Sequence, residues 1–308
     1  MAVGSAGAPQ SSPDLSDQSV DSSTVDSSTS RFAAFSFVDC ITQIDGVKRV
    51  TGRYTIPADA SYFPISLVAE AIGQLAAWVA MSAVNFRFRP VAALAGDTRI
   101  FSRPQPGDTL DLIVDIESCD QESITYRGHA MVGDQRVLEL LDTLGSMLDI
   151  SEFDDPTALA ADFVRLTTGG RAPGAFKGVA HPVLTDSSHE AGQKLQAQLD
   201  VPLQAPFFED HFPRRPVFPA TLMLDAQLQL AARIAAEVAG QPVHVTRITN
   251  VKVRAFTSPG ATLNLFAESA APGEDDPEPI LVKVGAQADG RTIAGAKMFF
   301  APDSGEHA

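Results

Sequence analysis

The chain is built around a proline-rich segment and the apolar run after it, which read Phe207-Phe208-Glu209-Asp210-His211-Phe212-Pro213-Arg214-Arg215-Pro216-Val217-Phe218-Pro219 and then 220–231. Each proline fixes its own φ angle, so we expect a stiff loop. Pro219 predicts the start of a helix, because proline is tolerated in the first turn, where its missing N–H would have no partner. The loop therefore presents one imidazole, His211, beside a largely buried helix that carries Asp225. This arrangement is the outline of an acid–base site.

The composition excludes several classes of function. The 308 residues are 44% hydrophobic, which is enough for two ordinary domains or one large one. A net charge of -15 argues against non-specific nucleic-acid binding, which needs a basic surface. Cys40 and Cys119 are far apart, so we expect reduced thiols. Because His, Cys and carboxylates form no ligand cluster in the sequence, we predict no metal and no cofactor.

Two long apolar runs raise the question of a membrane. Residues 67–84 are long enough to span one, but Glu70 and Gln74 interrupt them, and the related run 222–239 also carries charged residues. A buried helix that is apolar almost all round accounts better for both runs. Residues 1–10 have neither the basic start nor the apolar core of a secretory signal. We therefore expect a soluble, cytoplasmic protein with no membrane partner.

Along the chain, the sequence predicts an N-terminal tail, followed by two similar halves that are joined by a linker. Residues 1–30 are rich in Ser, Asp, Gly and Pro and contain no Lys or Arg, so we expect them to be disordered. Residues 151–180 include the glycine cluster TTGGRAPG, and we expect them to be a linker. A phosphate-binding loop is the less favoured interpretation, because the cluster is not followed by Lys-Ser/Thr. The other expected elements, by pattern, are strands from about Phe35 and at 49–56, a helix at 66–84, strands at 109–116, 123–131 and 136–148, a strand-like segment at 193–204, a helix at 221–239, and strands near 245–256, 261–269, 279–288 and 291–301.

The two halves repeat the same landmarks at an offset of about 155 residues, which indicates duplicated domains and not a solenoid of short repeats. The first expected helix contains Glu70-Ala71-Ile72-Gly73-Gln74, and the second contains Asp225-Ala226-Gln227-Leu228-Gln229 at the matching place. A Pro-Gly turn at 106–107 likewise matches one at 259–260. We therefore expect each half to contain strands, one long buried helix and an antiparallel sheet that wraps this helix.

The second half resembles the beta-hydroxyacyl-(acyl carrier protein) dehydratase family of fatty-acid synthesis, which has the hot-dog fold. The family pattern is His-Phe-Pro-x-x-Pro-x-x-Pro followed by Asp/Glu-Ala-x-x-Gln. It is matched here by His211, Phe212, Pro213, Pro216, Pro219, Asp225, Ala226 and Gln229. Residues 253–260 are similar to the family's later strand and Pro-Gly turn, and the resemblance covers roughly 181–300.

The first half resembles the same family more weakly, over about 35–150. It keeps Phe63-Pro64 and the Glu70–Gln74 segment, but Tyr62 stands where the histidine should be. The resemblance implies an α+β double hot-dog, with a degenerate half at 31–150, a linker at 151–180 and the half with the motif at 181–308. One chain would then replace the family's dimer, which leaves further dimerisation open.

The resemblance also implies a reaction and its residues. Removal of water from a 3-hydroxyacyl thioester needs a base for the C2 proton and an acid for the departing hydroxyl. In the family the histidine and the carboxylate come from facing protomers, which makes His211 the base and Glu70 the acid, with Gln74 supporting Glu70. The other pair, Tyr62 with Asp225, lacks a base. We therefore expect one working site and one vestigial site, with Asp225 as the alternative acid.

The same resemblance predicts the substrate-binding groups and the partner. Backbone amides at Ala220 and Thr221 would stabilise the thioester oxyanion, although the family usually has glycine at the first of these positions. Phe212 and Pro219 complete the predicted set. The substrate would be a thioester of acyl carrier protein or coenzyme A. Candidates for a basic docking patch are Arg87, Arg89, Arg103, Arg214, Arg215, Lys252 and Arg254, with scattered solubilising charge as the other interpretation.

Two alternatives to a dehydratase (a lyase of fatty-acid, polyketide or related lipid metabolism) stay open at this point. One is a catalytically degenerate double hot-dog that binds acyl chains or partners without turnover. The other is a hot-dog thioesterase. The remaining histidines with no evident constellation (His129, His181, His189 and His244) are expected on the surface or in strands.

Overall fold

The computed structural model describes residues 34–172, 176–271, 273 and 280–303, so the tail predicted at 1–30 lies outside the described residues. In the first half of the chain the elements are β1 (Cys40–Asp45), β2 (Arg49–Thr55), α1 (Ser66–Ala83), β3 (Phe88–Ile100), β4 (Thr109–Cys119), β5 (Ser123–Val132) and β6 (Gln135–Asp149). A short 3-10 turn, η1 (Ile150–Glu152), and α2 (Pro156–Thr168) follow. The second half contains β7 (Leu184–Glu190), β8 (Lys194–Asp200), η2 (Pro206–Glu209), α3 (Ala220–Ala239), β9 (Val243–Val253), β10 (Thr262–Ala270), β11 (Ile280–Ala288) and β12 (Arg291–Pro302).

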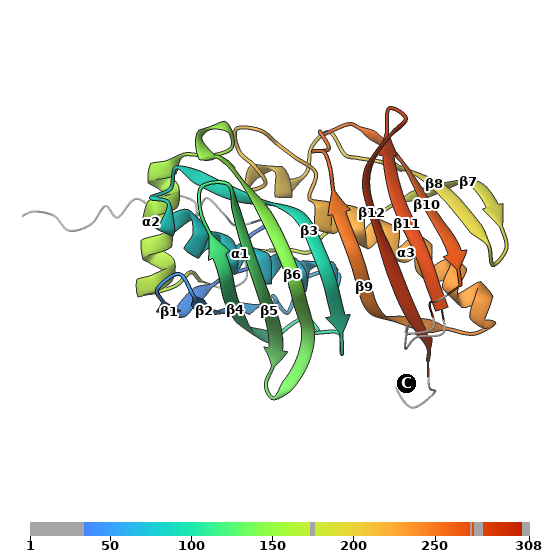
Figure 1. The fold of residues 1–308 in the computed structure, drawn as a ribbon, viewed down its shortest axis with the longest axis horizontal. Coiled ribbons are helices and arrows are strands. Elements are labelled where there is room, and N and C mark those ends of the chain that lie inside the picture. The colour runs from blue at the N-terminus through green and yellow to red at the C-terminus, as the bar shows by residue number, and fades with distance from the viewer. Residues whose placement is uncertain (1–33, 173–175, 272, 274–279, 304–308) are drawn as a thin grey trace, which may run out of the picture. The chain divides into compact units, whose positions relative to one another are not determined.

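The strands form one antiparallel sheet of 12 strands in the order β1-β2-β4-β5-β6-β3-β9-β12-β11-β10-β8-β7 (Figure 1). Taken from each outer edge inward, the two halves have the same order, because β7-β8-β10-β11-β12-β9 repeats β1-β2-β4-β5-β6-β3. The halves join where β3 pairs antiparallel with β9, with Ala95 opposite Val251 and Thr98 opposite Ile248. The predicted double hot-dog is therefore confirmed, with both copies in a single continuous sheet.

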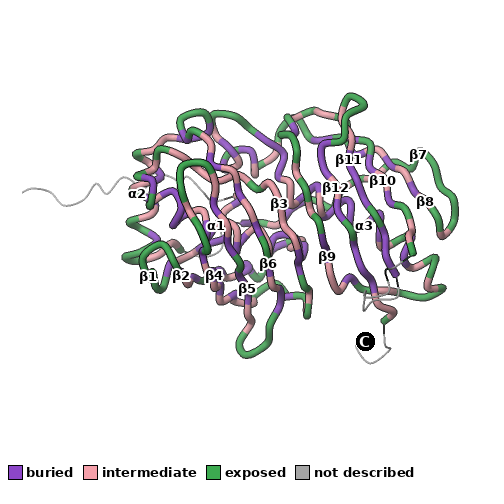
Figure 2. Tube along the Cα trace, viewed as in Figure 1, coloured by how far each residue is buried: buried purple, intermediate pink, exposed green. Residues whose placement is uncertain are grey.

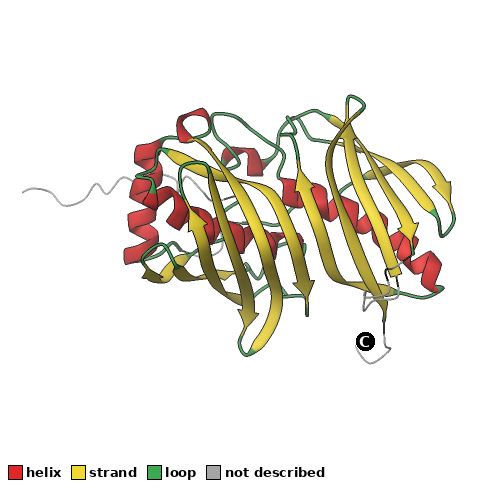
Figure 3. Ribbon diagram, viewed as in Figure 1, coloured by secondary structure: helices red, strands yellow, loops and turns green. Residues whose placement is uncertain are grey.

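Each half wraps its sheet around one long helix, α1 in the first half and α3 in the second (Figure 3). Burial alternates along strands such as β4, because one face of the sheet meets the helix and the other meets solvent (Figure 2). On α1 the side chains of Leu67, Ile72 and Leu75 are completely buried, and each stabilises the fold by about 1.5–3 kcal/mol relative to an exposed side chain.

The helix α1 lies unusually close to the sheet at one glycine. A Cβ at Gly128 would lie 2.6 Å from Cγ2 of Ile72 and 2.8 Å from the carbonyl oxygen of Ile113, so no larger residue fits there without a shift. The same helix is long and apolar enough to cross a membrane by composition, yet 61% of that window is buried inside the fold. This burial is that of the core helix of a soluble protein.

Two strands and one α-helix of the described residues were not predicted from the sequence. The strand β3 contains proline and glycine and few β-branched residues, and its extended conformation is imposed by pairing with β6 on one side and β9 on the other. The polar strand β7 forms the outer edge of the sheet and is mostly exposed. The helix α2 lies in the region predicted as a linker. Asp155 caps α2 by accepting hydrogen bonds from the backbone N–H groups of Thr157 and Ala158, and Pro156 occupies the first turn.

Candidate active site

The orientation of His211 is fixed by the loop that carries it. Its backbone N–H donates to the carbonyl of Phe207 at 2.9 Å, and its own carbonyl accepts from the N–H of Val217 at 3.0 Å. The Nδ1 atom of the ring lies 3.0 Å from the carbonyl oxygen of Val217. Because a carbonyl oxygen can only accept, Nδ1 carries the proton in this contact. When the imidazole is neutral, its lone pair is therefore on Nε2, as a general base requires.

Aromatic side chains surround the imidazole and keep it neutral. The ring of Phe212 stacks on it at 4.2 Å, and the ring of Phe35 meets it edge-on at 5.4 Å. Burial lowers the pKa of His211 below its usual value, while the charge of Glu70 and the hydrogen bond to Val217 act in the opposite direction. The net lowering favours the unprotonated ring at neutral pH.

Phe35 is held over the loop at 207–219 by Asp210, the residue next to His211. The Asp210 carboxylate accepts hydrogen bonds from the backbone N–H groups of Ala34 at 2.8 Å and of Phe35 at 2.6 Å. Gln74 holds the same segment from α1, because its Nε2 donates to the carbonyl of Phe35 at 3.0 Å. The segment at 34–37 is thus tied to the loop of one half and to the helix of the other.

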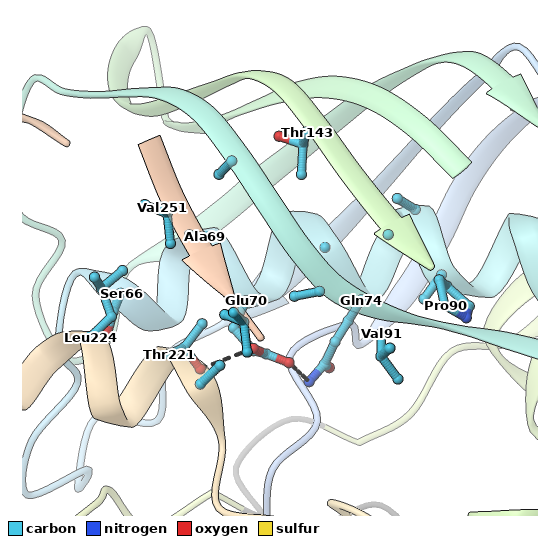
Figure 4. Close-up of a pocket in the computed structure, with 18 of the residues that line it drawn as sticks. Ser66, Ala69, Glu70, Gln74, Pro90, Val91, Thr143, Thr221, Leu224 and Val251 are labelled. Carbon is cyan, nitrogen blue, oxygen red and sulfur yellow. Dashed lines mark hydrogen bonds between the residues drawn. The ribbon is translucent and has the colours of Figure 1, made fainter. Parts of the chain in front are cut away.

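Glu70 lies in the first half of the chain and receives donors from both halves. Its Oε1 accepts from Nε2 of Gln74 at 3.0 Å, one turn further along α1. Its Oε2 accepts from the hydroxyl of Thr221 at 2.9 Å, in the first turn of α3 (Figure 4). The two hydrogen bonds fix the plane of the carboxyl group at the junction of the two helices.

A cavity of about 240 Å³ joins these groups. His211 and Glu70 both line it, so the structure brings together the two residues that the sequence analysis paired. Most other lining residues are apolar, from α1, the sheet and the start of α3; they include Ala69, Ala77, Met81, Leu138, Leu140 and Leu228. An apolar cavity with a few polar groups at one place is the usual form of a small-molecule site.

The predicted substrate-binding residues lie around the same cavity. Phe212, Gln74, Ala220 and Thr221 line it, and Pro219 is the buried N-cap residue of α3 beside them. The first N–H groups of a helix have no acceptor within the helix, and the helix dipole adds partial positive charge there. The start of α3 is therefore suited to a developing negative charge on a bound oxygen.

The second pair of equivalent positions forms a different contact. The hydroxyl of Tyr62 donates to Oδ1 of Asp225 at 2.9 Å, and Gln229 donates from Nε2 to Oδ2 at 3.1 Å. Asp225 is 3% exposed, and burial raises its pKa while these two hydrogen bonds lower it. Neither Tyr62 nor Asp225 belongs to the residues that line the cavity of His211. The structure thus places Asp225 outside the lining of the cavity that His211 shares with Glu70.

Two groups near these positions were not predicted from the sequence. The ring of His181 stacks on Tyr62 at 3.8 Å, and its charge lowers the pKa of Asp225. Arg89 was expected on a docking surface, but its side chain is 14% exposed and lines the cavity. Its guanidinium lies 3.9 Å from the ring centre of Phe212, a cation–π contact. Because both contacts join segments far apart in the chain, local sequence pattern carries no signal for them.

Arg89 contributes charge as well as packing. Its Nη1 lies 3.7 Å from Oδ2 of Asp154, and burial lowers its pKa to about 10, so it stays charged at neutral pH. That charge lowers the pKa of His211. The other residues proposed for a basic docking patch are exposed: Arg87, Arg103, Arg214, Arg215, Lys252 and Arg254.

Comparison with known proteins places this site in a family context. Residues 187–276 match the ApeI-like family, described as ApeI dehydratase. Over 72 residues the chain is 39% identical to the 3-hydroxyacyl-(acyl-carrier-protein) dehydratase FabZ of Rickettsia rickettsii (strain Sheila Smith), an alignment that covers 22% of this chain and 50% of that protein. The chain thus spans about half the length of the curated relatives it matches.

Two solved structures share the fold over most of the chain. A Lactobacillus plantarum protein described as an oleoyl thioesterase is 12% identical with a TM-score of 0.54, and the match covers 82% of this chain and 96% of that one. A tesB protein of Mycobacterium avium subspecies paratuberculosis is 13% identical with a TM-score of 0.53, over 85% and 96%. At such identities these structures show the fold alone. The resemblance to hot-dog dehydratases is confirmed. The match to the dehydratase family model, at 187–276, lies in the second half of the chain.

Proposed function

We propose that the protein is a dehydratase that converts a 3-hydroxyacyl thioester into the 2-enoyl thioester, with His211 as base and Glu70 as acid. The observation that carries the proposal is that both side chains line one mostly apolar cavity. Nδ1 of His211 is hydrogen-bonded to Val217, and no described residue is hydrogen-bonded to its Nε2. The carboxyl group of Glu70 accepts hydrogen bonds from Gln74 and Thr221. The half at 31–150 would supply the acid and the half at 181–308 the base, joined through 151–180.

The proposed reaction balances within the site. Nε2 of His211 takes the proton from C2, and negative charge develops on the thioester oxygen, where the first N–H groups of α3 at Ala220 and Thr221 stabilise it. The electrons then form the C2–C3 double bond as the C3–O bond breaks. Glu70, in its protonated form, gives its proton to the departing hydroxyl, which leaves as water. The imidazolium of His211 then gives its proton, through solvent, to the Glu70 carboxylate, which restores the starting state of both groups.

Glu70 is the better candidate for the acid than Asp225 for a geometric reason. An acid must be within reach of the same bound substrate as the base. Glu70 lines the cavity with His211, whereas Asp225 does not and already accepts hydrogen bonds from Tyr62 and Gln229. One working site per chain follows from this arrangement. The substrate would be carried by acyl carrier protein or coenzyme A, and the protein would act in the cytoplasm.

The proposal is tested by the rate of enoyl thioester formation from 3-hydroxyacyl thioesters. His211→Ala and Glu70→Gln are each expected to lower kcat/KM by about 100-fold or more, because general acid–base catalysis contributes about that much. Asp225→Asn is the matched control and is expected to stay within about threefold of the wild type. Equal losses in Asp225→Asn and none in Glu70→Gln would overturn the pairing.

The same assay separates the two alternatives. Release of free thiol without enoyl product would identify a thioesterase. Binding of acyl thioesters without turnover at any chain length would identify a degenerate acyl-binding protein. Either result would exclude the dehydratase.

A further inference from the structure

The cavity extends beyond Glu70 along α1 and meets a second polar group there. Gly73 lies three residues after Glu70 and lines the cavity, as do Tyr126 on β5 and Thr143 on β6. A Cβ at Gly73 would lie 3.3 Å from the Tyr126 hydroxyl oxygen, so the glycine gives this hydroxyl its place beside α1. Thr143 projects from the sheet across from α1 (Figure 4).

Tyr126 and Thr143 are direct cross-strand partners in the pairing of β5 with β6, so their side chains share one face of the sheet. Tyr126 is 8% exposed and Thr143 is 6% exposed. Within the described residues, the Thr143 hydroxyl has no hydrogen-bond partner, and no described residue hydrogen-bonds to the Tyr126 hydroxyl. Two hydroxyl-bearing side chains, neither of them hydrogen-bonded to a described residue, therefore lie on the same face of the sheet in the cavity wall, beyond the polar groups around Glu70.

Such a wall is poorly suited to a plain alkyl chain. The Thr143 hydroxyl oxygen is fully buried, and a buried hydroxyl without a partner costs about 1–3 kcal/mol, which valine would avoid. Phenylalanine in place of Tyr126 would likewise present no hydroxyl to an alkyl chain. Burial, with the charge of Glu70, raises the pKa of Tyr126, so its hydroxyl keeps its proton and is available as a donor. An occupant that carries a hydrogen-bond acceptor at this depth would satisfy the hydroxyls.

The spacing from Glu70 indicates where that acceptor belongs on the substrate. Three residues of α-helix rise about 4.5 Å. An extended chain advances roughly 1.2 Å per bond, because three bonds span about 3.3–3.6 Å. With the C3 hydroxyl at Glu70, the Tyr126 hydroxyl is then about four bonds further, near C7, and within a tyrosine's reach of C5. Chains built by two-carbon extension carry their oxygen atoms at these odd-numbered positions.

We propose that the cavity recognises 3-hydroxyacyl thioesters that carry a second oxygen atom at C5 or C7, held by Tyr126 and Thr143. This inference rests on the proposed dehydration. The reactions that supply the substrate are a two-carbon chain extension, on a chain that retained an earlier keto or hydroxyl group, and then a reduction of the new 3-keto group to the 3-hydroxyl by a hydride donor. The substrate class is then a partly reduced polyketide chain and not a saturated fatty acyl chain.

The test compares substrates of equal length with and without the second oxygen. The rate constants kcat/KM are measured for 3-hydroxydecanoyl, 3,5-dihydroxydecanoyl and 3,7-dihydroxydecanoyl pantetheine thioesters. The wild type is expected to prefer one of the dihydroxy substrates by about tenfold, the value of one hydrogen bond to an otherwise unpaired group. In Tyr126→Phe the ratio between the two substrate types is expected to fall severalfold toward one.

Two further variants make the result unambiguous. Thr143→Val tests the second hydroxyl independently of the tyrosine and is expected to lower the same ratio. Tyr54→Phe is the matched control, because Tyr54 is 2% exposed, its hydroxyl lacks a partner among the described residues, and it does not line the cavity. It should leave the ratio unchanged.

The outcomes separate this inference from the function on which it rests. A wild type that turns over the plain chain as well as both dihydroxy chains overturns the polar-chain inference and leaves the dehydratase in place. A preference that survives both Tyr126→Phe and Thr143→Val overturns it as well. No turnover of any of the three thioesters counts against the proposed dehydratase itself.

Discussion

The contact between Tyr62 and Asp225 allows the claim of a single working site to be tested through stability. Tyr62→Phe removes the hydroxyl that donates to Asp225 at 2.9 Å and changes little else in shape. Asp225 is 3% exposed and would keep only the hydrogen bond from Gln229. A buried hydrogen bond to a charged group is worth about 1.5–3 kcal/mol. We expect a loss of that size in the free energy of unfolding at neutral pH.

The sign of the pH dependence follows from the raised pKa of Asp225. Because burial raises this pKa in the folded state above its unfolded value, folding favours the protonated carboxyl. The stability that protonation contributes is fully present below the unfolded pKa and is lost as the pH rises through the folded pKa. Tyr62→Phe removes a donor that favours the ionised form, so the folded pKa rises further. The cost of the substitution is therefore small at acidic pH and largest above the folded pKa.

The measurement is urea unfolding of both proteins from about pH 4 to pH 8, with turnover of 3-hydroxyacyl thioesters recorded in parallel. Asp225→Asn is the control. It keeps the shape and removes the charge, so at neutral pH it should destabilise less than Tyr62→Phe. If Tyr62→Phe lowers the free energy of unfolding equally at about pH 4 and pH 8, the hydrogen bond does not depend on the charge of Asp225, and the burial argument is refuted. Loss of turnover in a stable Tyr62→Phe protein would show that the second pair takes part in catalysis.

Two further predictions concern the residues that position the imidazole. Arg89→Met removes a charge that lowers the pKa of His211, so the acid limb of the kcat/KM profile should move to higher pH by up to about one unit. Arg89→Lys should keep the limb in place, and an unmoved limb in both variants would contradict the assignment. Asp210→Asn weakens the hydrogen bonds that hold Ala34 and Phe35, so the free energy of unfolding in urea should fall by about 1 kcal/mol and kcat/KM should also fall. Wild-type values of both quantities would show that the segment does not need this anchor.

The parts of the fold that depend on local chemistry could be predicted from the sequence. Prolines and an apolar run indicated the stiff loop and α3, and the repeated segment around Glu70 and Asp225 indicated the duplication. The boundaries of α1 and α3 differ from the predicted ones by a single residue at one end. The pairing of halves was predicted through the family resemblance, because the sequence contains no local information on which helix faces which loop.

The parts that depend on distant contacts could not be predicted. The strand β3 owes its conformation to neighbours on both sides. Arg89, which it carries, contacts Phe212 in the loop of the opposite half. Tyr126 and Thr143 looked like ordinary strand residues, and their importance appears only when α1 lies against β5 at Gly73. In each case the role of the residue depends on whether its side chain or backbone contacts a segment far away in the chain, and the local sequence contains no information on such contacts.

Fusion of the two halves allows the two sets of equivalent positions to differ. In a symmetric dimer a single change of histidine to tyrosine would remove both bases, since each protomer supplies one. In one chain the two copies vary independently, so Tyr62 can replace a base in one half while His211 keeps the other. The Tyr62–Asp225 hydrogen bond then links the first half to α3, as the Thr221–Glu70 hydrogen bond links α3 to α1 at the cavity. The Tyr62–Asp225 pair therefore has a structural role that does not depend on catalysis: it joins the halves that hold His211 and Glu70 around one cavity.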